Sequence, residues 1–143
     1  MAGLSDYLEN KLIDHVFRGI SYSMPSTLYV GLHTADPTDA GGVGDLSGNG
    51  YARVALSPSA SSWLSTNGAS SGASSGTAGT TSNNVLITFP TPTANWGTVT
   101  NFSIYDVLTG GNILLSGTLT SAKTVNQGDI VSFSVSSLVV TFS

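Results

Sequence analysis

A histidine and three aspartates in one loop-rich stretch come closest to a metal site in this sequence. His33 is followed by Asp36, Asp39 and Asp45. Imidazole and carboxylate groups bind Zn²⁺ or Ca²⁺ when three or more of them converge on one point. The spacing lacks the Asp-x-Asp-x-Asp-Gly pattern of an EF-hand, and the stretch is rich in Gly and Pro, which form ordinary turns. We expect turns without a metal, and a calcium or zinc ion in this loop is the alternative.

Two further patterns could indicate hydrolytic chemistry. Gly-x-Ser-x-Gly, which holds the nucleophile of many serine hydrolases, occurs at residues 68–72 and 72–76. That nucleophile needs a strand before it and a helix after it, whereas both matches lie in a Ser/Gly tract. A glycosidase needs two carboxylates across a cleft, but Asp106 and Asp129 each stand beside a turn, where a carboxylate caps backbone donors. We expect no enzyme activity and no cofactor.

Three aromatic residues have a binding interpretation beside a structural one. Tyr51, Trp63 and Trp96 could stack against the rings of a sugar, as aromatic residues do in carbohydrate-binding modules. Trp96 also stands just before an expected strand, where a large side chain would close the edge of a core. We expect core or interface packing for these residues, with carbohydrate contact as the alternative.

The composition is that of a hydroxyl-rich β protein with few charged residues. Of the 143 residues, 8% are charged, 40% are hydrophobic and none is cysteine, while Ser and Thr together fill 40 positions. A chain of this size and mean hydropathy (+0.20) buries a sizeable core. Because hydroxyl groups replace charges, such a surface forms hydrogen bonds that respond little to salt or pH. Stability must come from packing, since no disulfide is available.

Four cations and eight acidic residues give the chain a net charge of −4. The cations are Lys11, Arg18, Arg53 and Lys123, too few and too scattered to neutralise a row of phosphates. No apolar run approaches the roughly 20 residues that cross a bilayer. The first eleven residues lack the basic and apolar regions of a secretion signal. We expect no nucleic acid and no membrane among the partners, and synthesis in a cytoplasm.

One amphipathic helix is expected over residues of about 5–18. Apolar residues recur every four positions from Leu4 to Ile20, Ser5 is suited to be the N-cap, and Gly19 is suited to end the helix. The helix holds three of the eight acids and two of the four cations. We therefore expect it to carry the charged surface of the molecule and to pack outside the β fold.

The rest of the chain predicts short β-strands. Apolar residues alternate with polar ones within 26–33, 51–56, 85–89, 98–106, 113–120, 130–135 and 138–142. Residues 34–50 are a loop by composition. The Ser/Gly-rich residues of about 57–82 predict a flexible excursion, in which residues 68–81 lack any group able to anchor them. The pattern favours a single mainly β domain over residues 1–143. Its expected form is an antiparallel β-sandwich or jelly-roll-like barrel with one N-terminal α-helix.

Three stretches of this sequence resemble a family of small phage virion structural proteins. They are residues 4–15 (LSDYLENKLIDH), 24–38 (MPSTLYVGLHTADPT) and 50–53 (GYAR). The C-terminal part adds Phe89-Pro90, residues 96–100 (WGTVT), Asp106 and Gly128-Asp129. The resemblance covers the chain apart from residues 57–82. It implies no catalytic residues, because the shared motifs are structural.

Proteins of this pattern are often labelled tail fibre proteins, and the compact ones resemble head decoration, or cement, proteins. The resemblance implies a capsid decoration protein that binds the outer surface of the major capsid protein lattice and stabilises the head. The alternative is a tail fibre or baseplate component that binds a receptor or glycan.

The same resemblance implies where the protein acts and what it contacts. We expect it on the capsid surface of the virion, after synthesis in the host bacterial cytoplasm, and as a homodimer or homotrimer. We expect the helix and the 34–50 loop to dock on a partner. The expected interface residues are Tyr7, Lys11, Asp36, Pro37, Tyr51, Arg53, Trp63 and Trp96.

Overall fold

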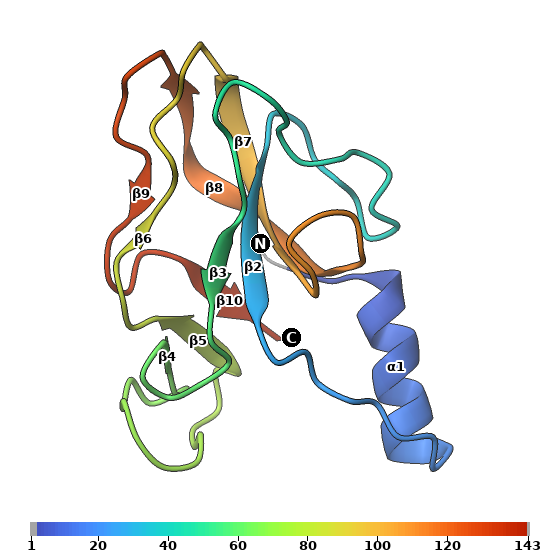
Figure 1. Ribbon diagram of the computed structural model, residues 1–143. Helices are drawn as coiled ribbons and strands as arrows, with labels where there is room; N and C mark the ends of the chain where they lie inside the picture. The colour runs from blue at the N-terminus through green and yellow to red at the C-terminus, as the bar shows by residue number, and fades with distance from the viewer. Residues whose placement is uncertain (1–2, 143) are drawn as a thin grey trace.

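A five-stranded antiparallel sheet forms the centre of the computed structural model, which describes residues 3–142 (Figure 1). Its order is β1-β8-β7-β2-β3. The strands are β1 (Gly3–Leu4), β8 (Ile113–Val125), β7 (Gly97–Tyr105), β2 (Leu28–His33) and β3 (Val54–Leu56). Strand β7 lies between two long neighbours, with Phe102 opposite Gly117 of β8 and Leu32 of β2. The last five residues of β7 are consequently all buried.

Two smaller antiparallel sheets complete the fold. One consists of β10 (Val139–Thr141), β5 (Thr80–Asn83) and β4 (Trp63–Leu64), and the other of β6 (Ile87–Thr88) and β9 (Ser132–Phe133). Ile87 and Val140 from these sheets share one apolar core with Leu32 and Ile104 of the central sheet. The prediction of a mainly β, antiparallel fold with one helix is therefore confirmed.

Two strand boundaries differ from the prediction. Strand β8 continues to Val125, five residues beyond the expected end, because Thr124 and Val125 pair with the start of β7 and the ladder holds their backbone. Strand β9 is shorter than expected and covers only Ser132–Phe133. Val131 and Phe133 of the expected strand pack against the core, but Ile130 is 86% exposed and only Ser132 and Phe133 pair with β6. Hydrogen bonding to a neighbour, rather than alternation alone, decides where these strands end.

The segment 57–82 contains anchoring groups that its composition does not suggest. Strands β4 and β5 lie in it and pair with each other, Trp63 opposite Asn83. Ser65 Oγ donates to the Ala69 carbonyl at 3.1 Å, and Thr81 Oγ1 donates to the Leu64 carbonyl at 2.7 Å. The expectation that residues 68–81 lack anchoring groups is therefore wrong, because the Thr81 hydroxyl binds the Leu64 carbonyl and β5 begins at Thr80. Its flexibility stays a prediction.

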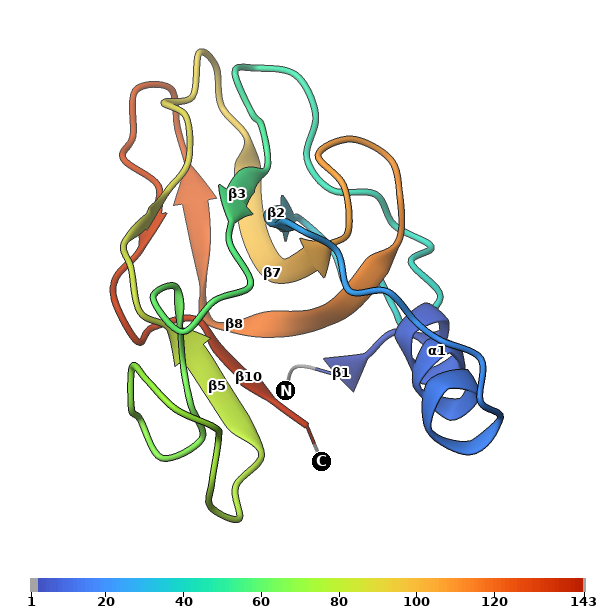
Figure 2. The ribbon, with the colours of Figure 1, turned by 60° about the horizontal axis from the view of Figure 1, so that its bottom comes forward.

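Helix α1 (Asp6–Phe17) begins and ends as the sequence predicts. Ser5 Oγ accepts a hydrogen bond from the Leu8 N–H, and Gly19 follows the helix with a φ of 68°. Ser5 also fixes the helix to its surroundings, since its N–H donates to the Leu114 carbonyl of β8. Within residues 3–142, no helix is long and apolar enough to cross a membrane. Figure 2 shows α1 and the β4–β5–β10 sheet at the same end of the molecule, with β1 between them.

Candidate functional site

Arg53, Asp45 and Tyr51 form a group that we call the polar cluster, and an ion pair between Arg53 and Asp45 is its centre. Arg53 Nε and Nη2 donate to the two carboxylate oxygens of Asp45, at 2.9 and 3.0 Å. The side chains are only 6% and 15% exposed. Burial alone would raise the pKa of Asp45, but the hydrogen bonds from Arg53 and Tyr51 outweigh it and lower this pKa. The pair therefore stays ionised over the physiological range.

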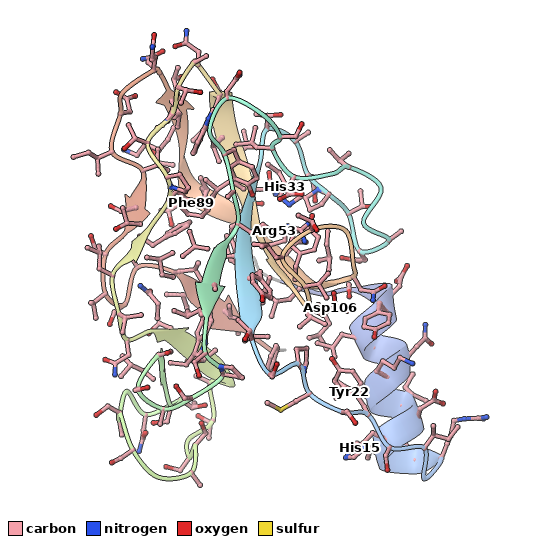
Figure 3. The ribbon with its side chains drawn as sticks, in the orientation of Figure 1. His15, Tyr22, His33, Arg53, Phe89 and Asp106 are labelled. Atoms are coloured by element: carbon pink, nitrogen blue, oxygen red, sulfur yellow. The ribbon has the colours of Figure 1, made fainter. Side chains whose placement is uncertain are left out.

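Arg53 also connects the 34–50 loop to the turn after β7. Its Nη1 donates to the Val107 and Gly110 carbonyls, both at 2.8 Å, and its guanidinium lies 3.2 Å from the ring centroid of Tyr105. Four of its five N–H groups are thus bound within the chain. Figure 3 shows Arg53 between β2 and this turn. Arg53 therefore positions two loops and has almost no free donor for a ligand.

Tyr51 links the ion pair to the central sheet. Its hydroxyl donates to Asp45 Oδ2 at 2.8 Å and accepts from the Leu32 N–H at 3.0 Å. Its ring packs edge-on against Trp96, with 5.4 Å between the ring centroids. Burial is the main reason why the pKa of this phenol is raised far above its usual value. Tyr51 therefore remains a neutral donor and holds the loop against β2.

His33 and Ser103 form a second buried pair beside the cluster. Both side chains are completely buried. His33 Nδ1 lies 3.0 Å from the Gly44 carbonyl, which can only accept, so Nδ1 carries the proton in the neutral ring and Nε2 accepts from Ser103 Oγ. Burial lowers the pKa of His33. The pair has no exposed atom that could meet a substrate, so its role is structural.

Acid is expected to destabilise the protein through His33. Because the folded-state pKa is lowered, the unfolded chain binds more protons once the pH falls below about 6.5. Stability is complete above that pH and is lost as the pH falls through the lower folded-state pKa. A second loss follows below about pH 3.8 through Asp45. Urea titrations from neutral to acidic pH measure both losses.

His33→Gln should flatten the dependence of the unfolding free energy on pH between neutral and mildly acidic conditions, because it removes the group whose pKa burial lowers. An unchanged pH slope in His33→Gln would show that another group causes the loss.

The metal alternative is not supported by the geometry. Among residues 3–142, no three His, Asp or Glu side chains converge as a metal site requires. Asp36 Oδ1 instead accepts from the Thr38 N–H at 2.9 Å, as in an ordinary turn, and Asp45 is occupied by Arg53. The two Gly-x-Ser-x-Gly matches lie in turns and bends between β4 and β5, without a helix after them. Neither pattern therefore has the structural context of its chemistry.

Helix α1 turns its apolar side away from the rest of the chain. Successive residues are about 100° apart around a helix, so the four residues that we call the apolar stripe share one side. They are Leu12, Ile13, Val16 and Phe17, which are 39%, 49%, 65% and 81% exposed. In the first turn, Tyr7 and Leu8 are partly buried and pack against the core. No residue of α1 is buried, and its apolar stripe is more exposed than Tyr7 and Leu8, which reverses the usual arrangement.

The comparison with protein families assigns the chain. A family model described as Podophage GP4 fiber I protein gp80 matches residues 3–141. The chain belongs to this family. It is therefore a phage virion structural protein, in agreement with the resemblance of its motifs. No curated protein matches the chain.

The structure brings together only some of the interface residues expected for this gp80 family member. Tyr51 and Arg53 meet in the polar cluster. Tyr7 and Lys11 are neighbours on α1, with Lys11 Nζ 5.5 Å from the ring centroid of Tyr7. Asp36 is exposed at the start of the 34–50 loop. These residues lie around the N-terminal half of α1 and the loop beside it.

The remaining three lie elsewhere. Pro37 is fully buried, and Trp96 is 7% exposed and donates from Nε1 to the Asn49 carbonyl at 2.9 Å. Trp63 is partly buried in β4. Pro37 and Trp96 thus have almost no surface left, and Trp96 has no open ring face on which a sugar could stack. Contact of all eight residues with a partner stays a prediction.

The sequence interpretation missed Asp45 as a partner of Arg53 and the outward orientation of the stripe. The composition gave a weak signal for Asp45. The chain has only twelve charged residues, four of them cations, so few pairings between a loop carboxylate and a cation are available. No comparable signal distinguishes an outward from an inward apolar face.

Proposed function

We propose that this chain is an adhesive fibre component of a podophage virion that acts without catalysis. The observation that carries the proposal is the match of residues 3–141 to a family described as a fiber protein. Two features of the chain fit this role. The polar cluster fixes the 34–50 loop, and the apolar stripe of α1 offers a surface that a neighbouring virion protein can bury. Because this surface carries little charge, its adhesion should depend little on salt.

The second candidate is a capsid decoration protein whose partner is the major capsid protein. The hydroxyl-rich, nearly neutral surface favours it, because a cement protein must hold to the lattice over a wide range of salt concentrations. The exposed stripe would then contact the outer face of the capsid. Both candidates bind a partner through the same weakly charged apolar stripe, and they differ in location and copy number.

Quantitative mass spectrometry of purified virions distinguishes the two candidates. A fibre component should be present in a few to tens of copies per particle, whereas a decoration protein should reach hundreds, close to the number of major capsid protein subunits. Gold-labelled antibody against the chain then gives its location. A signal on the tail or neck supports the fibre proposal, a signal over the whole head supports decoration, and absence of the chain from particles would overturn both.

A further inference from the structure

The exposed apolar surface of α1 is continued by the segment that follows the helix. Ile20 is 51% and Met24 is 69% exposed. Together with the stripe, these side chains leave on the order of 600 Å² of apolar surface in water, at the upper limit for the largest patch of a typical monomer. The charged pair of Asp14 and Arg18, at 2.8 Å, lies on the opposite side of the helix from Val16, because each is two positions, or about 200°, away around the axis. An exposed apolar surface of this size is typical of a site that another molecule contacts.

An open apolar cavity lies near the same end of the molecule. Its volume is about 380 Å³. It lies between the central sheet and the β4–β5–β10 sheet, and Figure 2 shows that sheet at the same end as α1. None of its lining residues is charged; among them are Met24, Leu28, Trp63, Ile104, Val140 and Phe142. Met24 therefore belongs both to the wall of the cavity and to the surface that continues α1.

Trp63 gives this cavity an unsatisfied polar group. Its Nε1 is buried and has no hydrogen-bond partner within residues 3–142. A buried donor without an acceptor is costly.

We propose that two copies of this chain associate by inserting the end of α1 from each copy, with Phe17 foremost, into the cavity of the other. One chain offers both a protruding apolar side chain and an uncharged cavity, so neither surface presents a charge to the other. In a symmetric pair each contact occurs twice. Helix surface and cavity wall together then approach the roughly 800 Å² per partner of a standard interface. The inference concerns self-association and does not depend on the location proposed above.

Sedimentation velocity over a range of concentrations tests the association. We expect a dimer for the unmodified chain. Phe17→Ser in the stripe and Ala69→Trp, which fills the cavity, should each weaken it roughly tenfold or more, as loss of a central apolar contact does. Ile130→Ser is the matched control, because Ile130 is about as exposed as Phe17, at 86% against 81%, but lies in the segment between β8 and β9. Circular dichroism and thermal melting must show that each variant is folded.

Disulfide trapping tests which surfaces meet. The chain has no cysteine, so Phe17→Cys and Ala69→Cys can be made singly and mixed. A disulfide that forms in the mixture and in neither variant alone supports insertion. Cross-linking of Phe17→Cys with itself would indicate that helices pair side by side and would overturn the cavity contact. A monomer at all concentrations, or a monomer whose stripe binds another virion protein, would overturn the second copy as the occupant.

Discussion

Replacing Arg53 by alanine is expected to lower the free energy of unfolding by about 3–5 kcal/mol, as breaking a buried ion pair does. The substitution leaves Asp45, whose side chain is 15% exposed, without its cation. The Val107 and Gly110 carbonyls lose their donors at the same time. Urea denaturation followed by the fluorescence of Trp63 and Trp96 measures the effect.

Arg18→Ala is the matched control for this prediction. Arg18 and Asp14 also form an ion pair, at 2.8 Å, but their side chains are 63% and 33% exposed. Solvent screens such a pair, so its loss should change the unfolding free energy by about 1 kcal/mol or less. Equal effects of Arg53→Ala and Arg18→Ala would show that burial of the Arg53 pair contributes nothing.

Arg53→Lys separates charge from geometry. Lysine keeps the positive charge near Asp45 but cannot donate to both carboxylate oxygens and to two carbonyls at once. We expect an intermediate loss of stability. If lysine restored full stability, charge alone would hold the 34–50 loop, and the connection to the turn after β7 would be dispensable.

The polar cluster shows how far a motif can predict a site. The GYAR stretch indicates that Tyr51 and Arg53 matter, and the structure places them in one network. Their common acceptor, Asp45, comes from a loop whose composition predicts only turns. The pairing depends on how that loop returns to β2, where the Leu46 N–H donates to the Leu32 carbonyl, a contact that local spacing does not encode. The sequence therefore indicated Tyr51 and Arg53. It did not indicate that both bind Asp45, or that the cluster holds the 34–50 loop.

Hydrogen bonds from backbone N–H groups to side-chain oxygens a few residues away could be predicted from the sequence. Ser5 caps α1, and Asp106 and Asp129 accept backbone N–H groups from Asn112 and Asn126, as turn residues should. In α1 the spacing of Leu12, Ile13, Val16 and Phe17 likewise predicts an apolar face. It does not tell whether the chain's own core or a second molecule covers that face. The amphipathic pattern shows which residues share a side of the helix, and only the tertiary fold shows what that side contacts.

Replacing Asn83 by alanine is expected to lower the free energy of unfolding by about 3 kcal/mol, because three hydrogen bonds to the backbone are lost at about 1 kcal/mol each. Asn83 is completely buried at the end of β5. Its Nδ2 donates to the Val85 and Ser134 carbonyls, both at 2.8 Å, and its Oδ1 accepts from the Leu138 N–H at 2.9 Å. This one amide therefore joins β5 to the segment between β9 and β10.

The neighbouring Asn84 supplies the control for Asn83. Its Nδ2 contacts the Ala60 and Ser61 carbonyls at 3.5 and 3.3 Å, near the limit of hydrogen bonding and exposed to water. Water can replace such bonds, so Asn84→Ala should cost about 0.5 kcal/mol or less. Hydrogen exchange adds a local test, since the Leu138 amide should exchange faster in Asn83→Ala than in Asn84→Ala. Equal protection of Leu138 in both variants would mean that packing of the β4–β5–β10 sheet, and not the Asn83 amide, holds this segment against the core.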